Sequence, residues 1–177
     1  MGKRVLLLTG NPGIGKTTTL LRIVEALKAK GYRVGGMVSR EVRDGGTRVG
    51  FEILDLSTNR RGWLAHVNQK TGPQVGKYRV NIEDLNNVGV EAILNAVKNC
   101  DVVAIDEIGP MELFSEKFKQ AVKDAVESGK LLIGVIHWKA KDKLIDMIKA
   151  REDTEIFMVT YENRGKLHQF VLGKVEG

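Results

Sequence analysis

One short segment constrains this chain more than any other feature of its sequence. The segment matches the pattern G-x-x-x-x-G-K-[S/T] in full, with Gly10, Asn11, Pro12, Gly13, Ile14, Gly15, Lys16 and Thr17. The apolar run from Val5 to Leu8 precedes it as an expected buried strand, and apolar residues at helical spacing follow it. This pattern binds phosphate when it lies between a strand and a helix. The segment therefore predicts a phosphate-binding loop.

Each part of this loop has a chemical purpose. Glycines let the backbone turn its N–H groups onto phosphate oxygens, and the following helix adds the positive end of its dipole. We expect Lys16 to contact the β- and γ-phosphates as a binding and catalytic group, and the hydroxyl of Thr17 to ligate Mg²⁺. Thr18 is included among the expected nucleotide-binding residues. The loop predicts a nucleoside triphosphate as ligand and Mg²⁺ as cofactor.

Two neighbouring acids end a later apolar strand, which runs from Val102 to Ile105. A phosphate-loop protein needs an acid at such a strand end to hold Mg²⁺, and Asp106 fits this requirement. Glu107 follows directly and is placed to orient or deprotonate a water molecule that attacks the γ-phosphorus. Glu112 is a rival base, but we expect it in the first turn of the next helix, where the dipole favours a carboxylate.

The Asp-Glu pair also predicts the order of the strands. It is typical of the class that has an additional strand between the phosphate-loop strand and the acidic strand. We expect the run from Leu131 to Ile136 to be this strand, which ends at His137. His137 would then face the γ-phosphate and sense it or position the water. The alternative is a histidine with a surface or packing role.

The rest of the chain alternates between strands and helices, which predicts an α/β sheet with helices on both faces. We expect a P-loop NTPase three-layer sandwich with a mostly parallel sheet, formed as one domain over residues 1–177. Residues 40–66 carry the turn Asp44-Gly45-Gly46 and predict an antiparallel hairpin excursion, and residues 68–77 a loop. Helices are expected around residues 90–97, 114–126 and 144–148, with a last strand over 156–159 and a closing helix over 163–172.

Composition and charge limit the class of protein and its partners. Hydrophobic residues make up 42% and charged residues 28%, which argues against disorder. The net charge of +6 favours polyanionic partners, either nucleotides or nucleic acids. The single cysteine, Cys100, allows no intramolecular disulfide, fits the cytoplasm and is expected in the core. We expect a cytoplasmic monomer with no membrane segment.

Further segments of the sequence carry a resemblance to a known family. These are Gly45-Gly46, Arg48 to Phe51, Leu54 to Leu56, Val75 to Tyr78, Val80-Asn81, Asp106 to Gly109, Met111 to Leu113, Val159-Thr160 and Glu162 to Arg164. With the phosphate loop, the chain resembles the THEP-type nucleoside-triphosphatases. The resemblance implies a cytoplasmic enzyme that hydrolyses several nucleoside triphosphates (ATP, GTP, CTP and UTP) to diphosphate and phosphate. Pro110 departs from the pattern, because a basic residue is expected after Gly109.

Residues outside the loop bear on base choice and on charge stabilisation. The guanine-reading tetrapeptide Asn-Lys-x-Asp does not occur, which agrees with loose base choice. Asn163 and Arg164 follow the last strand, so Arg164 is expected to stack on or cap the base, unless the pair is an exposed helix start. Arg40 and Arg43 follow the second expected strand, the apolar run from Val34 to Val38, and either stabilise the leaving phosphate or are solvated hairpin charges.

Two other classes of function stay open at this point. A nucleotide or small-molecule kinase would share the loop and the metal-binding acid, although Arg60-Arg61 is the nearest approach to an arginine-rich lid. A nucleic-acid-linked ATPase switch is permitted by the net charge. The aromatic content of 6% disfavours it, because single-strand binding relies on aromatic stacking.

Overall fold

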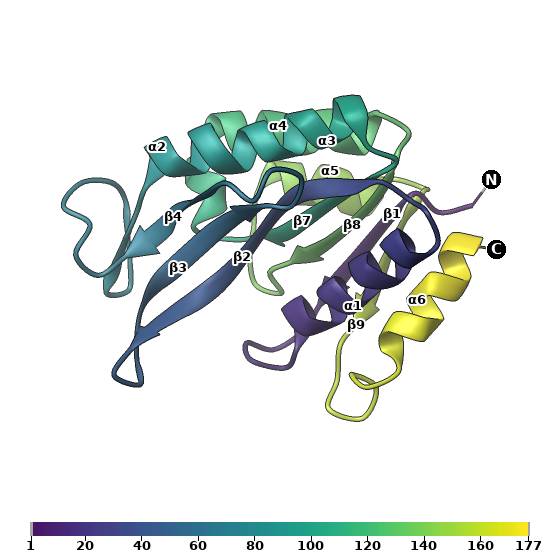
Figure 1. The fold of residues 1–177 in the computed structure, drawn as a ribbon, viewed down its shortest axis with the longest axis horizontal. Coiled ribbons are helices and arrows are strands. Elements are labelled where there is room, and N and C mark those ends of the chain that lie inside the picture. The colour runs from purple at the N-terminus through teal and green to yellow at the C-terminus, as the bar shows by residue number, and fades with distance from the viewer. Residues whose placement is uncertain (1, 177) are drawn as a thin grey trace.

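A computed structural model describes residues 2–176 and arranges them as one sheet between two layers of helices (Figure 1). The strands are β1 (Val5–Thr9), β2 (Val34–Asp44), β3 (Thr47–Asp55), β4 (Arg61–His66), β5 (Gln74–Val75), β6 (Tyr78–Val80), β7 (Val102–Ile108), β8 (Leu131–Ile136) and β9 (Thr154–Met158). The helices are α1 (Lys16–Ala29), α2 (Ile82–Asp84), α3 (Glu91–Asn99), α4 (Glu116–Glu127), α5 (Lys143–Ala150) and α6 (Leu167–Glu176). A π-helical turn, η1 (Leu85–Val90), and a 3₁₀ turn, η2 (Glu112–Phe114), complete the described segments.

One half of the sheet is parallel and contains the strands that matter for the site. Strands β2, β7, β8, β1 and β9 lie side by side in this order, and all their pairings are parallel. Both β1 and β8 are buried along their whole length, as expected where helices cover both faces. Strand β8 lies between β1 and β7, so the predicted strand order is confirmed. The carboxyl ends of these three strands therefore meet at one edge of the sheet.

The other half of the sheet is antiparallel and continues directly from β2. Strand β2 extends past the parallel region and turns back into β3 at Gly45 and Gly46, whose φ angles are 59° and 83°. Strands β4, β6 and β5 follow in antiparallel pairings. The predicted hairpin excursion thus widens the same sheet (Figure 1). Residues 68–77 do not form only a loop, because Gln74–Val75 pairs with Tyr78–Val80.

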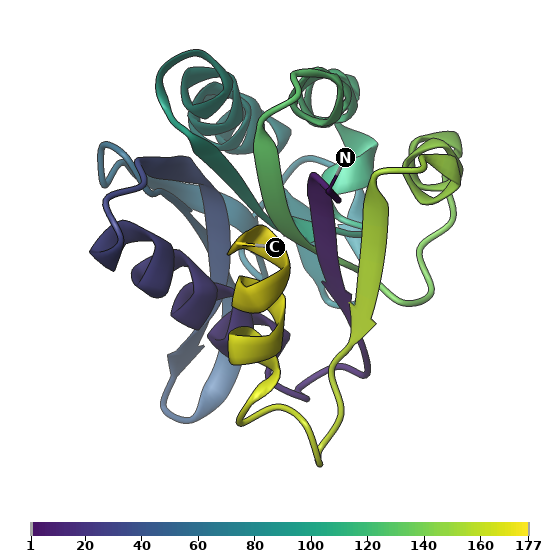
Figure 2. The same ribbon diagram turned by 90° about the vertical axis from the view of Figure 1, so that its right-hand side faces the viewer.

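Helices cover the two faces unequally. Helices α1 and α6 lie on one face, and α3, α4 and α5 lie on the other, as the turned view shows (Figure 2). The first layer packs Leu20 and Ile23 against the sheet, and the second packs Phe118 and Ile145. All four side chains are almost fully buried. The predicted three-layer α/β fold is confirmed.

Two predicted helix starts are wrong. The helix expected from Phe114 begins at Glu116, because the Ser115 side chain accepts a hydrogen bond from the Phe118 N–H and caps it. The closing helix expected from Asn163 begins at Leu167. Residues 161–166 form turns instead, and Thr160 and Asn163 exchange side-chain–backbone hydrogen bonds there. No helix among the described residues is long and apolar enough to cross a lipid bilayer.

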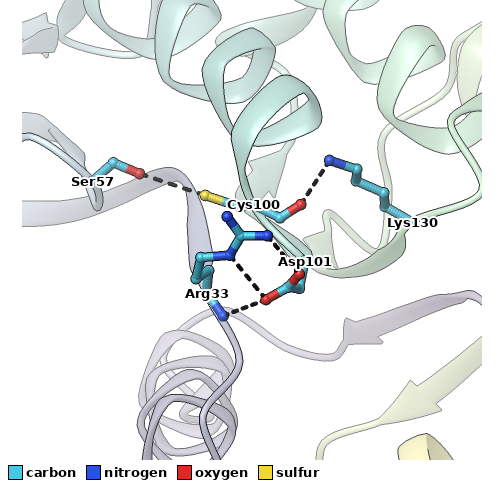
Figure 3. Close-up of polar contacts among 5 residues, drawn as sticks. All are labelled: Arg33, Ser57, Cys100, Asp101 and Lys130. Atoms are coloured by element: carbon cyan, nitrogen blue, oxygen red, sulfur yellow. Dashed lines mark hydrogen bonds and ion pairs between the residues drawn. The ribbon is translucent and has the colours of Figure 1, made fainter.

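Cys100 lies directly before the amino end of β7, whereas the phosphate loop follows the carboxyl end of β1. Figure 3 shows the polar contacts around Cys100. Its side chain belongs to the core, as predicted, and its Sγ lies 3.9 Å from the Ser57 Oγ. The backbone N–H of Arg33 donates to Asp101 Oδ2 at 2.8 Å, and its guanidinium pairs with the same carboxylate. Lys130 Nζ donates to the Cys100 carbonyl at 2.7 Å. These contacts tie together the starts of β2, β7 and β8.

Candidate active site

The phosphate loop joins the carboxyl end of β1 to the start of α1. Gly10 has a φ of 148°, and a Cβ there would lie 2.7 Å from the Val159 carbonyl oxygen, so only glycine fits. Gly15 is the N-cap of α1 with a φ of 111° and provides no side-chain cap. The first N–H groups of α1 therefore stay available for an anion, as a phosphate-binding helix requires.

Lys16 lies over this loop. Its Nζ donates to the Gly10 carbonyl at 2.8 Å and to the Asn11 carbonyl at 3.3 Å. The residue is 9% exposed, and these two hydrogen bonds hold its ammonium close to the loop. Within residues 2–176 it takes part in no ion pair with a carboxylate. A positive charge in this position is ready to contact phosphate oxygens.

Thr17 and Asp106 meet at the start of α1 and the end of β7. The Thr17 Oγ1 donates to Asp106 Oδ2 at 2.8 Å, and Asp106 is 2% exposed. A hydroxyl and a carboxylate are the oxygen ligands that Mg²⁺ prefers, so this pair fits a magnesium ion. Within residues 2–176, no group of three or more His, Cys, Asp or Glu side chains could hold a metal alone. Such an ion would therefore take its other ligands from phosphate and water.

Burial controls the ionisation of three acids at this site. It raises the pKa of Asp106 from 3.8 to about 7, against the opposing effect of the Thr17 hydrogen bond. Burial also raises the pKa of Glu107, while the charges of His137 and Lys16 lower it. Burial raises the pKa of Glu112 well above its ordinary value, and the Glu107 charge adds to this.

Glu112 lies in a different place from the one predicted. It belongs to η2, a separate 3₁₀ turn before α4, and it is only 2% exposed. The helix dipole of α4 therefore does not explain its position. Its neighbours Met111 and Leu113 are apolar, which indicates that the segment packs against the core, but this local pattern does not show that Glu112 itself is buried.

His137 follows β8 at the same sheet edge. Its backbone N–H donates to the Ile108 carbonyl at 3.0 Å, and its Nδ1 accepts from the Lys139 N–H at 3.2 Å. The side chain lines the same cavity as Lys16 and Glu107. The structure thus places His137 where the predicted strand order required it.

A cavity of about 590 Å³ connects these groups. Among the residues predicted for the site, it is lined by Pro12, Gly13, Gly15, Lys16, Thr17, Thr18, Asp106, Glu107 and His137. Of the two arginines considered for the transition state, Arg40 lines the cavity and pairs with Glu52 at 2.9 Å. Arg43 does not line it, because its side chain binds Glu41 and the Gly46 carbonyl within the hairpin.

The two residues predicted at the base differ in their contacts. The Asn163 side chain is committed to its own turn, since its Nδ2 donates to the Met158 carbonyl at 2.8 Å. The Arg164 guanidinium lies 4.6 Å from the centre of the Tyr161 ring, and its Nη1 is 3.5 Å from the Ile14 carbonyl oxygen. Arg164 therefore lies beside the phosphate loop, stacked on an exposed aromatic ring.

The chain matches known proteins over almost its whole length. The model of a family described as NTPase matches residues 5–172. The nucleoside-triphosphatase THEP1 of Thermofilum pendens is 49% identical over 168 residues, which are 94% of this chain and 92% of that protein. The chain belongs to the THEP1 family. The THEP1 of Methanocaldococcus jannaschii is 45% identical, with 96% of each chain covered.

Two solved structures share the fold of this THEP1-family chain. The crystal structure of THEP1 from the hyperthermophile Aquifex aeolicus superposes with a TM-score of 0.85 at 28% identity, covering 98% of this chain and 99% of that one. The solution structure of a human cancer-related nucleoside triphosphatase gives a TM-score of 0.82 at 36% identity, covering 98% and 97%. The family resemblance and the fold class inferred from the sequence are both confirmed.

Proposed function

We propose that this protein hydrolyses nucleoside triphosphates to diphosphate and phosphate with Mg²⁺. The observation that carries the proposal is the convergence of Lys16, Thr17, Asp106, Glu107 and His137 on one cavity. These residues come from the carboxyl ends of β1, β7 and β8, where a parallel α/β sheet places its ligands. Membership of the THEP1 family supports the same reaction.

The groups divide the chemistry between them. The loop N–H groups and Lys16 hold the β- and γ-phosphates, and Thr17 and Asp106 hold Mg²⁺, which offsets the negative charge of the phosphates. Glu107 orients a water molecule and takes its proton as the oxygen attacks the γ-phosphorus. His137 lies on the same cavity wall and positions the water or the γ-phosphate.

Base choice is proposed to be loose, with ATP, GTP, CTP and UTP all accepted. Arg164 on the Tyr161 ring offers a flat cationic surface beside the loop. A stacking surface of this kind is tolerant, because every base has a π-face. The protein is further proposed to act as a cytoplasmic monomer, in keeping with the free thiol of Cys100.

The proposal is tested by phosphate release from each of the four triphosphates, with and without Mg²⁺. We expect comparable release from all four, dependence on Mg²⁺, and a turnover below about 10² s⁻¹. Glu107→Gln should lower kcat about 10²- to 10³-fold and leave nucleotide binding nearly unchanged, because it removes the proton acceptor and keeps the shape.

The matched control is Glu116→Gln, which removes an exposed carboxylate at the start of α4. This variant should retain the parent rate. Full turnover by Glu107→Gln, or release from one triphosphate only, would contradict the proposed mechanism or the proposed base tolerance, respectively.

A further inference from the structure

The cavity extends beyond the groups that hold phosphate. We call the part of the cavity beside its apolar lining residues the side chamber. Five apolar residues line the side chamber: Phe51, Leu64, Val75, Pro110 and Met111. They come from β3, β4, β5 and the segment after β7, and they line the same cavity as Glu107.

The walls of the side chamber are held in place by packing. Phe51 contacts Tyr78 edge to face, with ring centres 5.2 Å apart. Arg48 lies over both rings, with its guanidinium 5.4 Å from the centre of Phe51, and its Nε donates to the Tyr78 hydroxyl at 2.9 Å. A second contact joins Arg48 to Glu41. Phe51, held by these contacts, therefore gives the chamber one aromatic side chain, which suits recognition of an apolar body.

Polar residues line the same cavity. Glu112 is 2% exposed, lies close enough to Glu107 for that charge to raise its pKa, and has no cationic partner among the ion pairs of the described residues. Ser39, Arg40, Glu41 and Arg48 line the cavity as well. An apolar space with a few convergent polar groups is the usual form of a small-molecule site.

Hydrolysis alone does not account for this chamber. Water needs no apolar surface, and the base of the nucleotide is assigned to Arg164 and Tyr161, neither of which lines the cavity. An apolar pocket beside the γ-phosphate site would instead bring a second molecule close to the reacting phosphorus.

We propose that the side chamber binds a small alcohol with an apolar ring, which accepts the γ-phosphoryl group in competition with water. This inference rests on the proposed hydrolysis. A bond forms between the alcohol oxygen and the γ-phosphorus, and the bond from that phosphorus to the bridging oxygen breaks. The nucleoside diphosphate leaves with the electron pair, the alcohol becomes a phosphate monoester, and its proton passes to Glu107, which takes the proton of water in hydrolysis.

The test measures how the γ-phosphoryl group divides between two products. The protein is incubated with Mg²⁺, ATP and 2-phenylethanol, and phosphate monoester and inorganic phosphate are quantified together. Ethanol at the same concentration is the control for unassisted transfer, and 2-phenylethyl methyl ether is the control that lacks a hydroxyl. We expect a ratio of ester to phosphate at least about tenfold higher with 2-phenylethanol than with ethanol, because the ring is buried in the chamber.

Variants then locate the acceptor. Val75→Trp fills the side chamber from the partly exposed two-residue strand β5, and Met111→Trp fills it from the segment after β7. Both should lower the ratio at least about tenfold, whereas Val175→Trp on α6 should leave it unchanged. The ratio is independent of how much protein folds, because both products come from the same folded molecules.

Three outcomes overturn the inference. The first is a ratio for 2-phenylethanol equal to that for ethanol, and the second is a ratio that both chamber-filling variants leave unchanged. If phosphate release is normal, either result rejects the proposed acceptor site and leaves the proposed hydrolysis standing. The third is that the parent forms neither phosphate monoester nor inorganic phosphate. This result rejects the proposed function, and the proposal of an acceptor site is rejected together with it.

Discussion

At the scale of single residues, Asp106 dominates the electrostatics of the site. It is almost fully buried, and its hydroxyl partner Thr17 does not offset the cost of removing the carboxylate from water. Burial therefore raises the pKa of Asp106 to about 7. The nucleotide-free site favours a proton where the nucleotide-bound site is proposed to hold Mg²⁺, so we expect magnesium binding to release protons near neutral pH.

The first prediction concerns stability as a function of pH. Unfolded Asp106 has its ordinary pKa of 3.8, whereas the folded pKa is about 7. Between these values the folded protein holds a proton that the unfolded chain has lost. The free energy of unfolding should therefore fall as the pH rises from about 4 to about 7, and the raised pKa values of Glu107 and Glu112 add to the fall. Thermal denaturation at several pH values between 4 and 7, without nucleotide or Mg²⁺, measures this change in stability.

Asp106→Asn separates this effect from other titrations. The amide keeps an acceptor for Thr17 and removes the buried charge. At pH 8, without nucleotide, the variant should be more stable than the parent by about 2 kcal/mol. Asp124→Asn, at an exposed position of α4, should change stability little. A parent whose stability rises from pH 4 to 7, or an Asp106→Asn variant no more stable than the parent at pH 8, would show that burial of the acid is compensated.

The second prediction concerns the cationic surface beside the loop. Arg164→Ala removes the guanidinium that stacks on Tyr161. Because the stack touches the base in ground and transition state alike, KM should rise about threefold to tenfold for all four triphosphates, with kcat nearly unchanged. Steady-state phosphate release measures both constants. Lys166→Ala, which removes another exposed cation nearby, is the control, and equal KM values for Arg164→Ala and the parent would dismiss the stacking role.

At the scale of elements, Ser115 links α4 to the segment before α3. The hydroxyl accepts from the Phe118 N–H at 3.0 Å and donates to the Asn86 side chain at 2.5 Å. Ser115 is 1% exposed. Its position fixes where α4 begins, and therefore where the η2 turn that carries Glu112 ends.

The third prediction follows from this cap. Ser115→Ala removes the cap and leaves buried donors and acceptors without partners. The free energy of unfolding should fall by about 1–2 kcal/mol. Urea denaturation measures this change, and Ser115→Thr, which keeps a hydroxyl, should recover most of it. A fall of the same size in both variants would mean that lost packing space, rather than the cap, is responsible.

At the scale of the whole molecule, one hydrophobic cluster crosses both halves of the sheet. It joins Ile53 of β3, Leu64 of β4 and Val80 of β6 to Ile105 of β7 and Leu132 of β8. Because the two halves share this core, we expect that neither half stays folded when the other unfolds. The single domain expected from the sequence remains a prediction, and it can be tested by unfolding.

The fourth prediction is that both halves unfold together. Trp63 lies in β4 of the antiparallel half and Trp138 follows β8 of the parallel half, so each reports on one half. Single-tryptophan variants, Trp138→Phe and Trp63→Phe, should give urea transitions with the same cooperativity by fluorescence and by circular dichroism. An earlier fluorescence transition for Trp63 alone would mean that the antiparallel half opens first.

Much of the fold and part of the site could be predicted from local patterns. The loop from Gly10 to Thr17 is contiguous, so the residues expected to bind phosphate can be recognised from one short stretch of sequence. Asp106 and Glu107 directly end an apolar run, and that pair also gave the correct position of β8. By contrast, the start of the closing helix was wrong, because hydrogen bonds between Thr160 and Asn163 compete with the helix in the preceding turns.

The phosphate loop, the acidic strand end, the position of β8 and the family could all be inferred from the sequence, because each rests on neighbouring residues or on a periodic apolar pattern. The burial of Glu112 and the side chamber are visible only in the folded structure. The chamber joins Phe51, Val75 and Met111, which are far apart in the sequence. Their proximity depends on the pairing register of β3, β4, β5 and β6 and on the packing of the turn after β7, and no local pattern specifies these long-range contacts.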